Sequence, residues 1–299
     1  MNGSRKPHLG WIGLGALGSP MAANLLAAGF PLRVHNRTPG PEQPLLAGGA
    51  QAAASPLKTA SGTEVLCLCL SDDQAVQAVL EQARGGLAPG SLVIDFSTIA
   101  PASSQALAAQ LAGLGVAYLD APVTGGTEGA RAGRLSVLVG GEAADLERAR
   151  PVLEVVGSRI THLGPVGAGQ QAKAVNQVLV AGSYAAVAEA MALGQRLGLP
   201  MDQVRDALTA GAAGSWALEH RAGNMLEGRF PLGFRLALHR KDLAIALESA
   251  AATGLEIPLC RLVAAMEDAL LEAGHGDDDV SALARWYAAE ADSPARPGM

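Results

Sequence analysis

The feature that most constrains the fold is a glycine-rich turn near the start of the chain. Residues 8–12 have the pattern of a short buried strand, and residues 20–28 that of a helix ending at Gly29. The turn between them reads G-x-G-x-x-G and consists of Gly13, Leu14, Gly15, Ala16, Leu17 and Gly18. In this context the glycines allow a tight turn, close approach of a pyrophosphate to the backbone, and packing of helix on strand. A purely structural turn is the alternative in a chain with 37 glycines, but the strand–helix context favours a dinucleotide site.

The turn after the second predicted strand, residues 31–35, bears on the choice of dinucleotide. An NAD site usually has an acidic residue here, about 20 residues past the glycines, to accept the ribose hydroxyls. This chain has Asn36, Arg37 and Thr38 instead. A guanidinium can bind a 2′-phosphate in bidentate fashion, so the turn predicts NADP in preference to NAD. The alternative is that Arg37 only covers the adenine, which would leave the preference mixed.

Further apolar runs continue the predicted α/β sheet. Strands are expected at 64–70, 91–95, 116–119, 135–139 and 159–162, with helices expected from Asp72 and from Pro101. Ligands of such sheets bind beyond the carboxyl ends of the strands, so Leu70, Ser71 and Thr98 are expected to border the cofactor. Thr98 could equally cap the helix that follows, alone or in addition to bordering the cofactor.

Two stretches carry candidate substrate-binding groups. Residues 120–126 end in Thr124, Gly125 and Gly126, whose free amides and hydroxyl suit a carboxylate, although a plain turn is an equal alternative. After Gly167 an uninterrupted helical pattern runs to about Gly198, long enough to join two bodies. It places Lys173 on one face with Asn176 and Gln177, as a proton donor with positioning partners would require. A lysine on a solvated first turn is the alternative.

The second half of the chain shows only amphipathic helical patterns, expected at about 201–210, 217–226, 237–252, 257–273 and 280–289. Asp279 is a candidate cap for the last of them. Trp216 and Phe234 could wall a substrate site or simply belong to the core. The expected organisation is an α/β domain at 1–166 and an all-helical domain at 167–299. An Ala-rich helical domain with few aromatic residues predicts a homodimer or homotetramer.

Composition excludes several classes of protein. A net charge of −6 without a cluster of basic residues argues against a nucleic-acid partner. The six histidines lack metal-ligand spacing, so no metal is expected. The start has no signal-peptide core, and no apolar run of 18 uncharged residues suggests a membrane span, so a cytoplasmic location is expected. Cys67 and Cys69 alternate in an apolar run, as reduced core residues do.

Taken together, these motifs resemble the β-hydroxyacid dehydrogenases, a family that includes 3-hydroxyisobutyrate dehydrogenase and tartronate semialdehyde reductase. The matching stretches occur in family order and read GLGALGSPMAANLLAAG, DFSTIAP, DAPVTGG, GRLSVLVGG, GAGQQAKAVNQ and GFRLALHRKDLAIAL. The resemblance implies a Rossmann domain followed by an all-helical domain, with a long helix joining them. It also implies that Lys173 is the catalytic acid/base, that Asn176 helps to place the substrate, and that Thr124, Gly125 and Gly126 hold its carboxylate. Thr98 and Lys241 would border the nicotinamide.

The expected function is hydride transfer between NAD(P) and a small 3-hydroxy or 3-oxo carboxylic acid. Gln177 gives the order Lys-x-x-Asn-Gln, which resembles the tartronate semialdehyde reductase branch. The Asn36-Arg37-Thr38 turn instead resembles NADPH-dependent glyoxylate or succinic semialdehyde reductases, which is the alternative. A third possibility, a non-catalytic NADP-binding module, would not need Lys173, Asn176 or Lys241.

Overall fold

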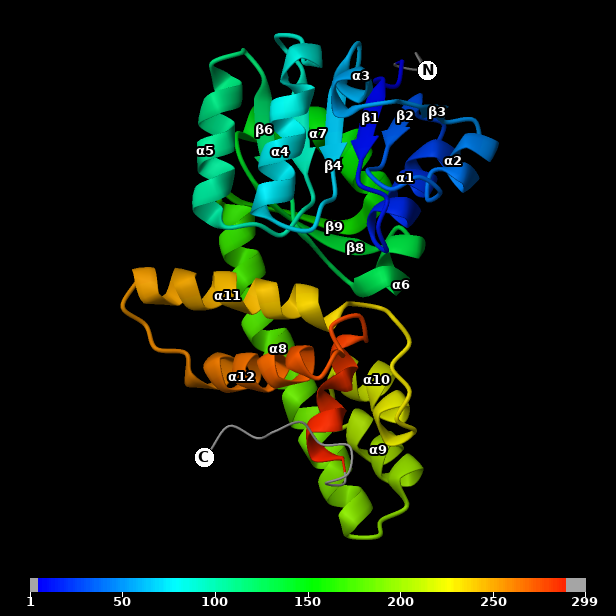
Figure 1. Ribbon diagram of the computed structural model, residues 1–299, viewed down its shortest axis with the longest axis vertical. Coiled ribbons are helices and arrows are strands. Elements are labelled where there is room, and N and C mark those ends of the chain that lie inside the picture. The colour runs from blue at the N-terminus through cyan, green and yellow to red at the C-terminus, as the bar shows by residue number, and fades with distance from the viewer. Residues whose placement is uncertain (1–4, 289–299) are drawn as a thin grey trace. The chain divides into compact units, whose positions relative to one another are not determined.

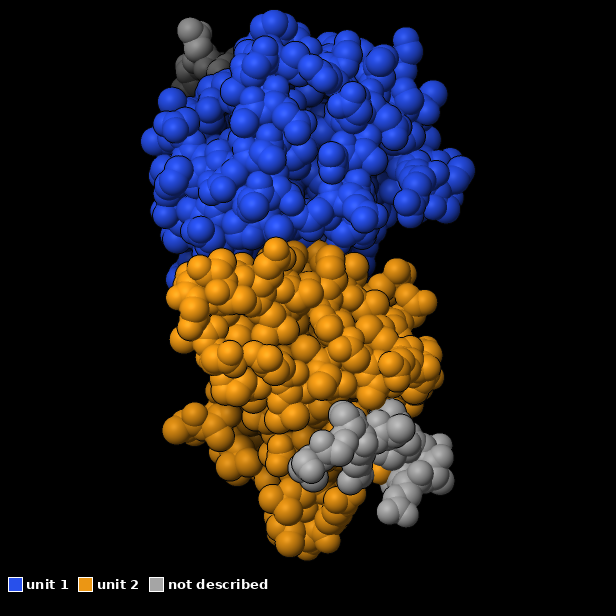
Figure 2. Space-filling model, turned by 60° about the vertical axis from the view of Figure 1, so that its left-hand side comes forward, with its two compact units in different colours: residues 1–173 blue, residues 174–299 orange. Residues whose placement is uncertain are grey.

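The computed structural model describes residues 5–288, which form two compact units. The division falls between Lys173 and Ala174, inside the long helix, and Figure 2 colours the two units separately. Each unit has a hydrophobic core of its own.

The first unit is built on a mixed sheet of nine strands within the described residues. The order is β3-β2-β1-β4-β5-β6-β8-β7, with β9 paired to β8. The six strands from β3 to β6 are parallel, whereas β8 runs antiparallel to β6 and β7. Their bounds are β1 Leu9–Ile12, β2 Leu32–His35, β3 Gln51–Ala52, β4 Val65–Leu68, β5 Leu92–Asp95, β6 Ala117–Asp120, β7 Val123–Thr124, β8 Leu135–Gly140 and β9 Gly157–Gly164. The predicted α/β fold with a mostly parallel sheet is confirmed.

Helices cover both faces of this sheet, because its central strands are apolar on both sides. Trp11, Cys67 and Ile94 face one core with α1 and α7, whereas Ile12, Leu68 and Val93 face a second core with α4 and α5. Figure 1 shows α4 and α5 in front of the sheet and α7 behind it. The helices are α1 Gly18–Ala27, α2 Gln43–Ala47, α3 Pro56–Ala60, α4 Asp73–Ala83, α5 Pro101–Ala112, α6 Gly126–Arg131 and α7 Ala143–Val156, with a 3₁₀ turn η1 at Arg84–Gly86.

The second unit is helical throughout its described residues, apart from one β-bridge between Arg235 and Asp279. It consists of the part of α8 (Ala168–Arg196) beyond the division, together with α9 Met201–Thr209, α10 Trp216–Leu226, α11 Leu236–Ala252, α12 Pro258–Glu272 and η2 Val280–Tyr287. The predicted helices are confirmed to within two residues, except the last. Asp279 caps η2 as predicted, since its carboxylate accepts the N–H of Ser281 at 3.0 Å.

The helix predicted at 280–289 is present from Val280 to Tyr287 as the 3₁₀ helix η2, and residue 289 lies outside the described residues. Four consecutive residues, Val280 to Leu283, are buried, so the segment lacks the one-sided apolar stripe of an amphipathic α-helix. Its start is also held by a backbone hydrogen bond of 2.8 Å from the N–H of Val280 to the carbonyl oxygen of Phe234. With eight residues, η2 is longer than most 3₁₀ helices.

Helix α8 is the one described helix that is long and apolar enough, by length and composition alone, to cross a membrane. That test is also passed by helices that lie inside a protein core. Ala181, Tyr184 and Ala188 are buried in the core of the second unit. Composition and packing together therefore describe α8 as a core helix of that unit.

Candidate active site

The glycine turn leaves open space at one of its three glycines and none at the other two. Gly13 has a φ of +100°, and a Cβ atom added to it would lie 2.2 Å from the carbonyl oxygen of Cys69. A Cβ added to Gly18 would lie 2.1 Å from the carbonyl oxygen of Gly13. At Gly15 an added Cβ would meet no atom within 4 Å. The geometry fits a dinucleotide, since Gly13 and Gly18 close the turn while Gly15 leaves its outer side open to a pyrophosphate.

The end of β2 holds this turn in place. Asn36 accepts the N–H of Leu14 on its Oδ1 atom at 2.9 Å and donates from Nδ2 to the carbonyl oxygen of Thr38 at 2.7 Å. Both ends of this amide are therefore used within the protein. Arg37 and Thr38 are exposed beside it. Of the three residues, Arg37 and Thr38 are the ones whose side chains face solvent and can meet a phosphate.

The ends of β4 and β5 are tied to the first turn of α8. Ser97 accepts the N–H of Leu70 on its hydroxyl at 2.9 Å, and its carbonyl oxygen accepts a hydrogen bond of 2.8 Å from the side chain of Gln170. The other end of that amide accepts the N–H of Ile99 at 3.3 Å. These bonds fix the segments that carry Leu70 and Thr98. The cap of α5 is Ala100, with no side-chain bond, so the alternative of Thr98 as its cap was wrong.

Asp95 lies beneath these segments and is completely buried. Its carboxylate accepts the N–H of Ser97 at 2.9 Å and the hydroxyl of Tyr118 at 3.0 Å. Burial raises the pKa of Asp95 to about 6, against the opposing effect of those hydrogen bonds. Burial also raises the pKa of the Cys69 thiol to about 12, so this thiol stays protonated near neutral pH.

A second buried carboxylate, Asp120, holds the start of α8. It accepts the N–H groups of Gly167 at 2.8 Å and Gln170 at 2.9 Å. Burial raises the pKa of Asp120, while these two amides act in the opposite direction. The first turn of the long helix is thereby fixed to the end of β6, one turn before Lys173.

Lys173 lies on the next turn of α8, and its side chain reaches strand β7. Its Nζ atom donates to the carbonyl oxygen of Val123 at 2.9 Å, and the residue is only 7% exposed. The alternative of a lysine on a solvated turn was therefore wrong. The residues after Val123 are Thr124, Gly125 and Gly126, at the junction of β7 and α6. The first unit thus brings the candidate proton donor and the candidate carboxylate loop together.

In the second unit, the other candidate residues form a hydrogen-bonded chain. Asn176 donates from Nδ2 to Oε1 of Gln177 at 2.6 Å, and Gln177 donates from Nε2 to Oδ2 of Asp242 at 2.7 Å. The ammonium of Lys241 lies 2.8 Å from Oδ1 of the same carboxylate. Gln177 and Asp242 are 1% and 3% exposed, so these contacts are shielded from water.

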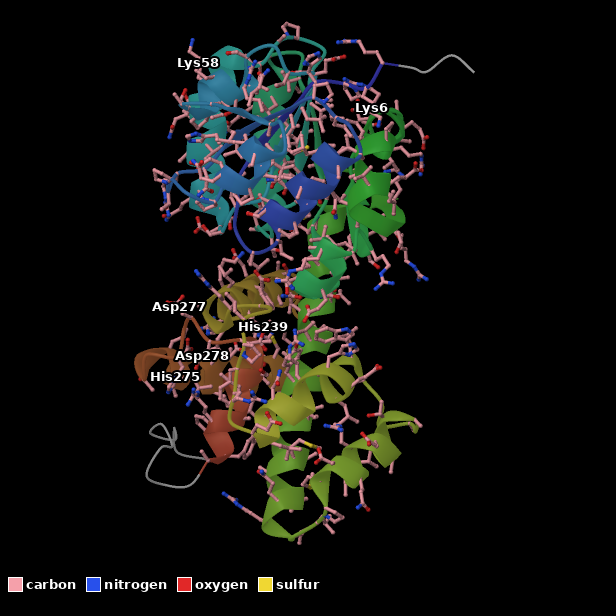
Figure 3. The ribbon with its side chains drawn as sticks, turned by 90° about the vertical axis from the view of Figure 1, so that its right-hand side faces the viewer. Lys6, Lys58, His239, His275, Asp277 and Asp278 are labelled. Carbon is pink, nitrogen blue, oxygen red and sulfur yellow. The ribbon has the colours of Figure 1, made fainter. Side chains whose placement is uncertain are left out.

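Phe234 and Trp216 have different environments. Phe234 packs edge-on against His239 at a centroid distance of 5.6 Å, and its N–H donates to the Asp279 carboxylate. His239, labelled in Figure 3, is buried and pairs with Glu267 at 2.5 Å. Trp216 is 41% exposed and is therefore not a core residue. Among residues 5–288, no group of three or more His, Cys, Asp or Glu side chains is placed to hold a metal ion.

Sequence reasoning missed Asp95 and Gln170 and gave Asp120 no role. A signal was present for the two aspartates, because each is the last residue of an apolar strand, in the sequences LVID and AYLD. A carboxylate at that position must lie at the buried end of the sheet, where it needs hydrogen-bond donors. Gln170 had no comparable signal, because its partners are more than 70 residues away in sequence.

Comparisons with known proteins match both halves of the chain. Residues 8–164 match the family model of the NAD binding domain of 6-phosphogluconate dehydrogenase. Residues 167–287 match the model described as the NAD-binding domain of NADP-dependent 3-hydroxyisobutyrate dehydrogenase.

Individual relatives are similar over nearly their whole length. The NAD-dependent L-serine dehydrogenase of Pseudomonas aeruginosa is 39% identical over 94% of this chain and 97% of its own. The 2-hydroxy-3-oxopropionate reductase of Escherichia coli is 40% identical over 84% of this chain and 86% of its own. A structure of Mycobacterium tuberculosis 3-hydroxyisobutyrate dehydrogenase with L-serine superposes with a TM-score of 0.85 at 33% identity, covering 95% of this chain and all of the other.

Proposed function

Because the chain belongs to the 3-hydroxyisobutyrate dehydrogenase family of NAD(P)-dependent oxidoreductases, we propose that it transfers a hydride between NADP(H) and a small 3-hydroxy or 3-oxo acid. The observation that carries the proposal is the hydrogen bond from Lys173 to Val123, beside Thr124, Gly125 and Gly126. This bond places the buried amine of Lys173 next to the loop of Thr124, Gly125 and Gly126, which suits a carboxylate.

The cofactor is proposed to lie along the glycine turn, with its pyrophosphate at Gly15. The residues proposed to hold it are Gly13, Leu14, Gly15, Ala16, Leu17, Gly18, Arg37, Thr38, Leu70, Ser71, Thr98 and Lys241, while Asn36 holds the glycine turn in place through its bonds to Leu14 and Thr38. When bound, NADP(H) supplies or accepts the hydride. NADP is preferred to NAD in this proposal because Arg37 and Thr38 are exposed and no acidic residue takes their place.

Lys173 is proposed to be the group that donates the proton to the substrate oxygen or accepts it. In the reducing direction, the substrate's carbonyl oxygen gains negative charge as the hydride arrives, and the Lys173 ammonium stabilises it and then donates a proton. In the oxidising direction, neutral Lys173 accepts the hydroxyl proton. The Thr124 hydroxyl and the amides of Gly125 and Gly126 are proposed to hold the carboxylate, which fixes the reacting carbon. A displacement of ~1 Å can cost about a hundredfold in rate, so this anchor is expected to matter for turnover.

The test is a set of initial rates with purified enzyme. Tartronate semialdehyde, glyoxylate, succinic semialdehyde and 3-hydroxyisobutyrate are each tried with both nicotinamides. Turnover of tartronate semialdehyde or 3-hydroxyisobutyrate, faster with the phosphorylated cofactor, supports the proposal. Turnover confined to glyoxylate or succinic semialdehyde would favour the second candidate, which rests on Arg37. Tight NADPH binding without turnover of any acid would contradict both and favour a binding module.

We also propose that the protein is a homodimer or homotetramer. The support is an exposed apolar stripe formed by Val175, Leu179 and Leu193 on α8 and by Leu197 just after its end, which are 64%, 71%, 59% and 65% exposed. Their spacing places them on one side of the helix. Leu259 and Leu262 on α12 are also more than half exposed. Exposed apolar surface of this kind usually marks an interface.

A further inference from the structure

The chain of contacts from Lys241 through Asp242 and Gln177 to Asn176 has a fixed direction. A lysine ammonium only donates hydrogen bonds, and an ionised carboxylate only accepts them. Lys241 therefore donates to Oδ1 of Asp242, which leaves Oδ2 to accept from Gln177. Gln177 must turn its nitrogen toward Asp242, so its oxygen faces Asn176. Asn176 must then turn its own nitrogen toward Gln177.

This direction decides which end of the Asn176 amide is available. Consecutive residues of a helix project about 100° apart, and the bond between Asn176 and Gln177 bridges that angle on α8. Because Nδ2 of Asn176 is engaged, its Oδ1 atom is turned away from Gln177. This oxygen accepts no hydrogen bond from residues 5–288. Asn176 therefore presents a hydrogen-bond acceptor.

We propose that Asp242 is a positioning residue that fixes the polarity of the Gln177–Asn176 pair, so that the site selects 3-hydroxy acids carrying a hydrogen-bond donor on carbon 2. The proposal rests on the proposed function, in which Asn176 places the substrate. The favoured donor is a hydroxyl or an ammonium group. A methyl group on carbon 2 would leave the Asn176 oxygen without a partner, and sites built around a hydrogen bond reject analogues that lack it.

The substitution Asp242→Asn keeps the hydrogen bond between residue 242 and Gln177 but reverses which of the two donates. Lys241 can only donate, so the oxygen of the new amide faces Lys241 and its nitrogen faces Gln177. Gln177 then turns over, and Asn176 follows, presenting Nδ2 where Oδ1 had been. A hydroxyl on carbon 2 can accept from that nitrogen, whereas an ammonium cannot. The substitution is therefore expected to act against the ammonium substrate while sparing the hydroxyl one.

The experiment compares glycerate, L-serine, 3-hydroxyisobutyrate and 3-hydroxypropionate, which differ only at carbon 2. The enzyme with its native sequence is expected to favour glycerate and L-serine over the methyl acid by at least about tenfold in kcat/KM. In Asp242→Asn the ratio of L-serine to glycerate is expected to fall about tenfold or more. The double variant Gln177→Glu/Asp242→Asn again gives Asn176 an acceptor to donate to, and should restore the ratio.

Two further variants separate polarity from charge. Gln177→Met keeps the Asp242–Lys241 pair but removes the amide between Asp242 and Asn176, so the preference for donors on carbon 2 should weaken. Asp268→Asn removes a carboxylate that is paired with Arg240 elsewhere in the same unit, and should leave all ratios unchanged. An unaltered L-serine to glycerate ratio in Asp242→Asn would overturn the proposal. So would a native preference in Gln177→Met, or no rescue by the double variant.

Calorimetric binding of the same four acids in the presence of NADP⁺ distinguishes this proposal from the proposed function. Binding in the expected order without turnover would contradict the proposed function and support the role of Asp242. Turnover without any preference at carbon 2 would support the function and overturn the role of Asp242. Absence of both binding and turnover would overturn both.

Discussion

The Lys173 ammonium donates to the carbonyl oxygen of Val123 at 2.9 Å, although the two residues lie 50 positions apart in sequence. The contact joins the second turn of α8 to β7. Asp120 secures the same junction one turn earlier through the N–H groups of Gly167 and Gln170. The amine is thus held by groups that are fixed before any ligand arrives, as preorganised catalysis requires.

Replacing Lys173 with alanine is expected to lower kcat by about a hundredfold to ten-thousandfold, the usual contribution of a general acid. The affinity for NADPH, measured by fluorescence titration, should change little, because the glycine turn is not altered. Lys58→Ala is the matched control, since Lys58 is exposed on α3 and is labelled in Figure 3. Near-native turnover in Lys173→Ala would contradict the assignment.

Two substitutions in the glycine turn should affect different properties: Gly15→Val the binding of NADPH, and Gly18→Ala the stability of the protein itself. Gly15→Val places its side chain in open space, so thermal stability without cofactor should be unchanged while the Kd for NADPH rises by at least about tenfold. Gly18→Ala would put a Cβ 2.1 Å from the carbonyl oxygen of Gly13 and should lower stability even without cofactor. Calorimetric melting with and without NADPH checks both. A Gly15→Val protein still stabilised by NADPH as strongly as the native one would argue against the site.

Arg37→Ala is expected to weaken the preference for NADPH over NADH. Loss of a charge-assisted hydrogen bond of ~1.5–3 kcal/mol corresponds to roughly a tenfold to hundredfold rise in the KM for NADPH. The KM for NADH should stay within about twofold, because that cofactor lacks the 2′-phosphate. Arg84→Ala, which removes an exposed arginine elsewhere in the unit, serves as control. Equal effects on both cofactors would show that Arg37 covers the adenine instead.

Because burial raises the pKa of Asp95, the free energy of unfolding is expected to depend on pH. Its folded-state pKa of about 6 lies above the ordinary 3.8, so between these values the folded state binds more protons than the unfolded state. Stability from this group is therefore lost as the pH rises through that window, by about 3 kcal/mol in total. Asp95→Asn should remove this loss. Urea unfolding at pH 4.5 and 7.5 checks it, and a variant with the native pH dependence would contradict the prediction.

Leu179→Glu is expected to dissociate the proposed oligomer, because it places a charge in the middle of the exposed stripe on α8. Light scattering after gel filtration should give a smaller assembly than the native protein. Leu57→Glu, at an exposed leucine of the first unit, should leave the mass unchanged. A monomeric native protein would refute the proposed interface directly.

The sequence predicted those parts of the molecule that depend on local patterns. Strands β1, β4 and β5 are continuous apolar runs, and the glycine turn between β1 and α1 has a fixed spacing, so both could be read directly. Short elements such as β3 and α2 carry too few residues to show a period, and they were not predicted.

The support beneath the candidate site could not be predicted in the same way. The bonds from Gln170 to Ser97 and Ile99 join residues more than 70 positions apart, and no local pattern encodes such a pairing. Asn36 illustrates a second limit. The sequence suggested a ligand-facing polar group, whereas the structure shows its amide bonded to Leu14 and Thr38. The residue type showed that a polar side chain lies at this position, but not whether it bonds to a ligand or within the protein.

The unbroken course of α8 from Ala168 to Arg196 has a consequence for any catalytic cycle. Lys173 and Asn176 are three residues apart on one helix, and a rise of about 1.5 Å per residue separates them by ~4.5 Å along its axis. That spacing is set by backbone hydrogen bonds of the helix. If Lys173 and Asn176 have the roles proposed for them, the proton donor and the amide that contacts carbon 2 therefore keep a constant spacing along the helix axis for as long as α8 stays intact.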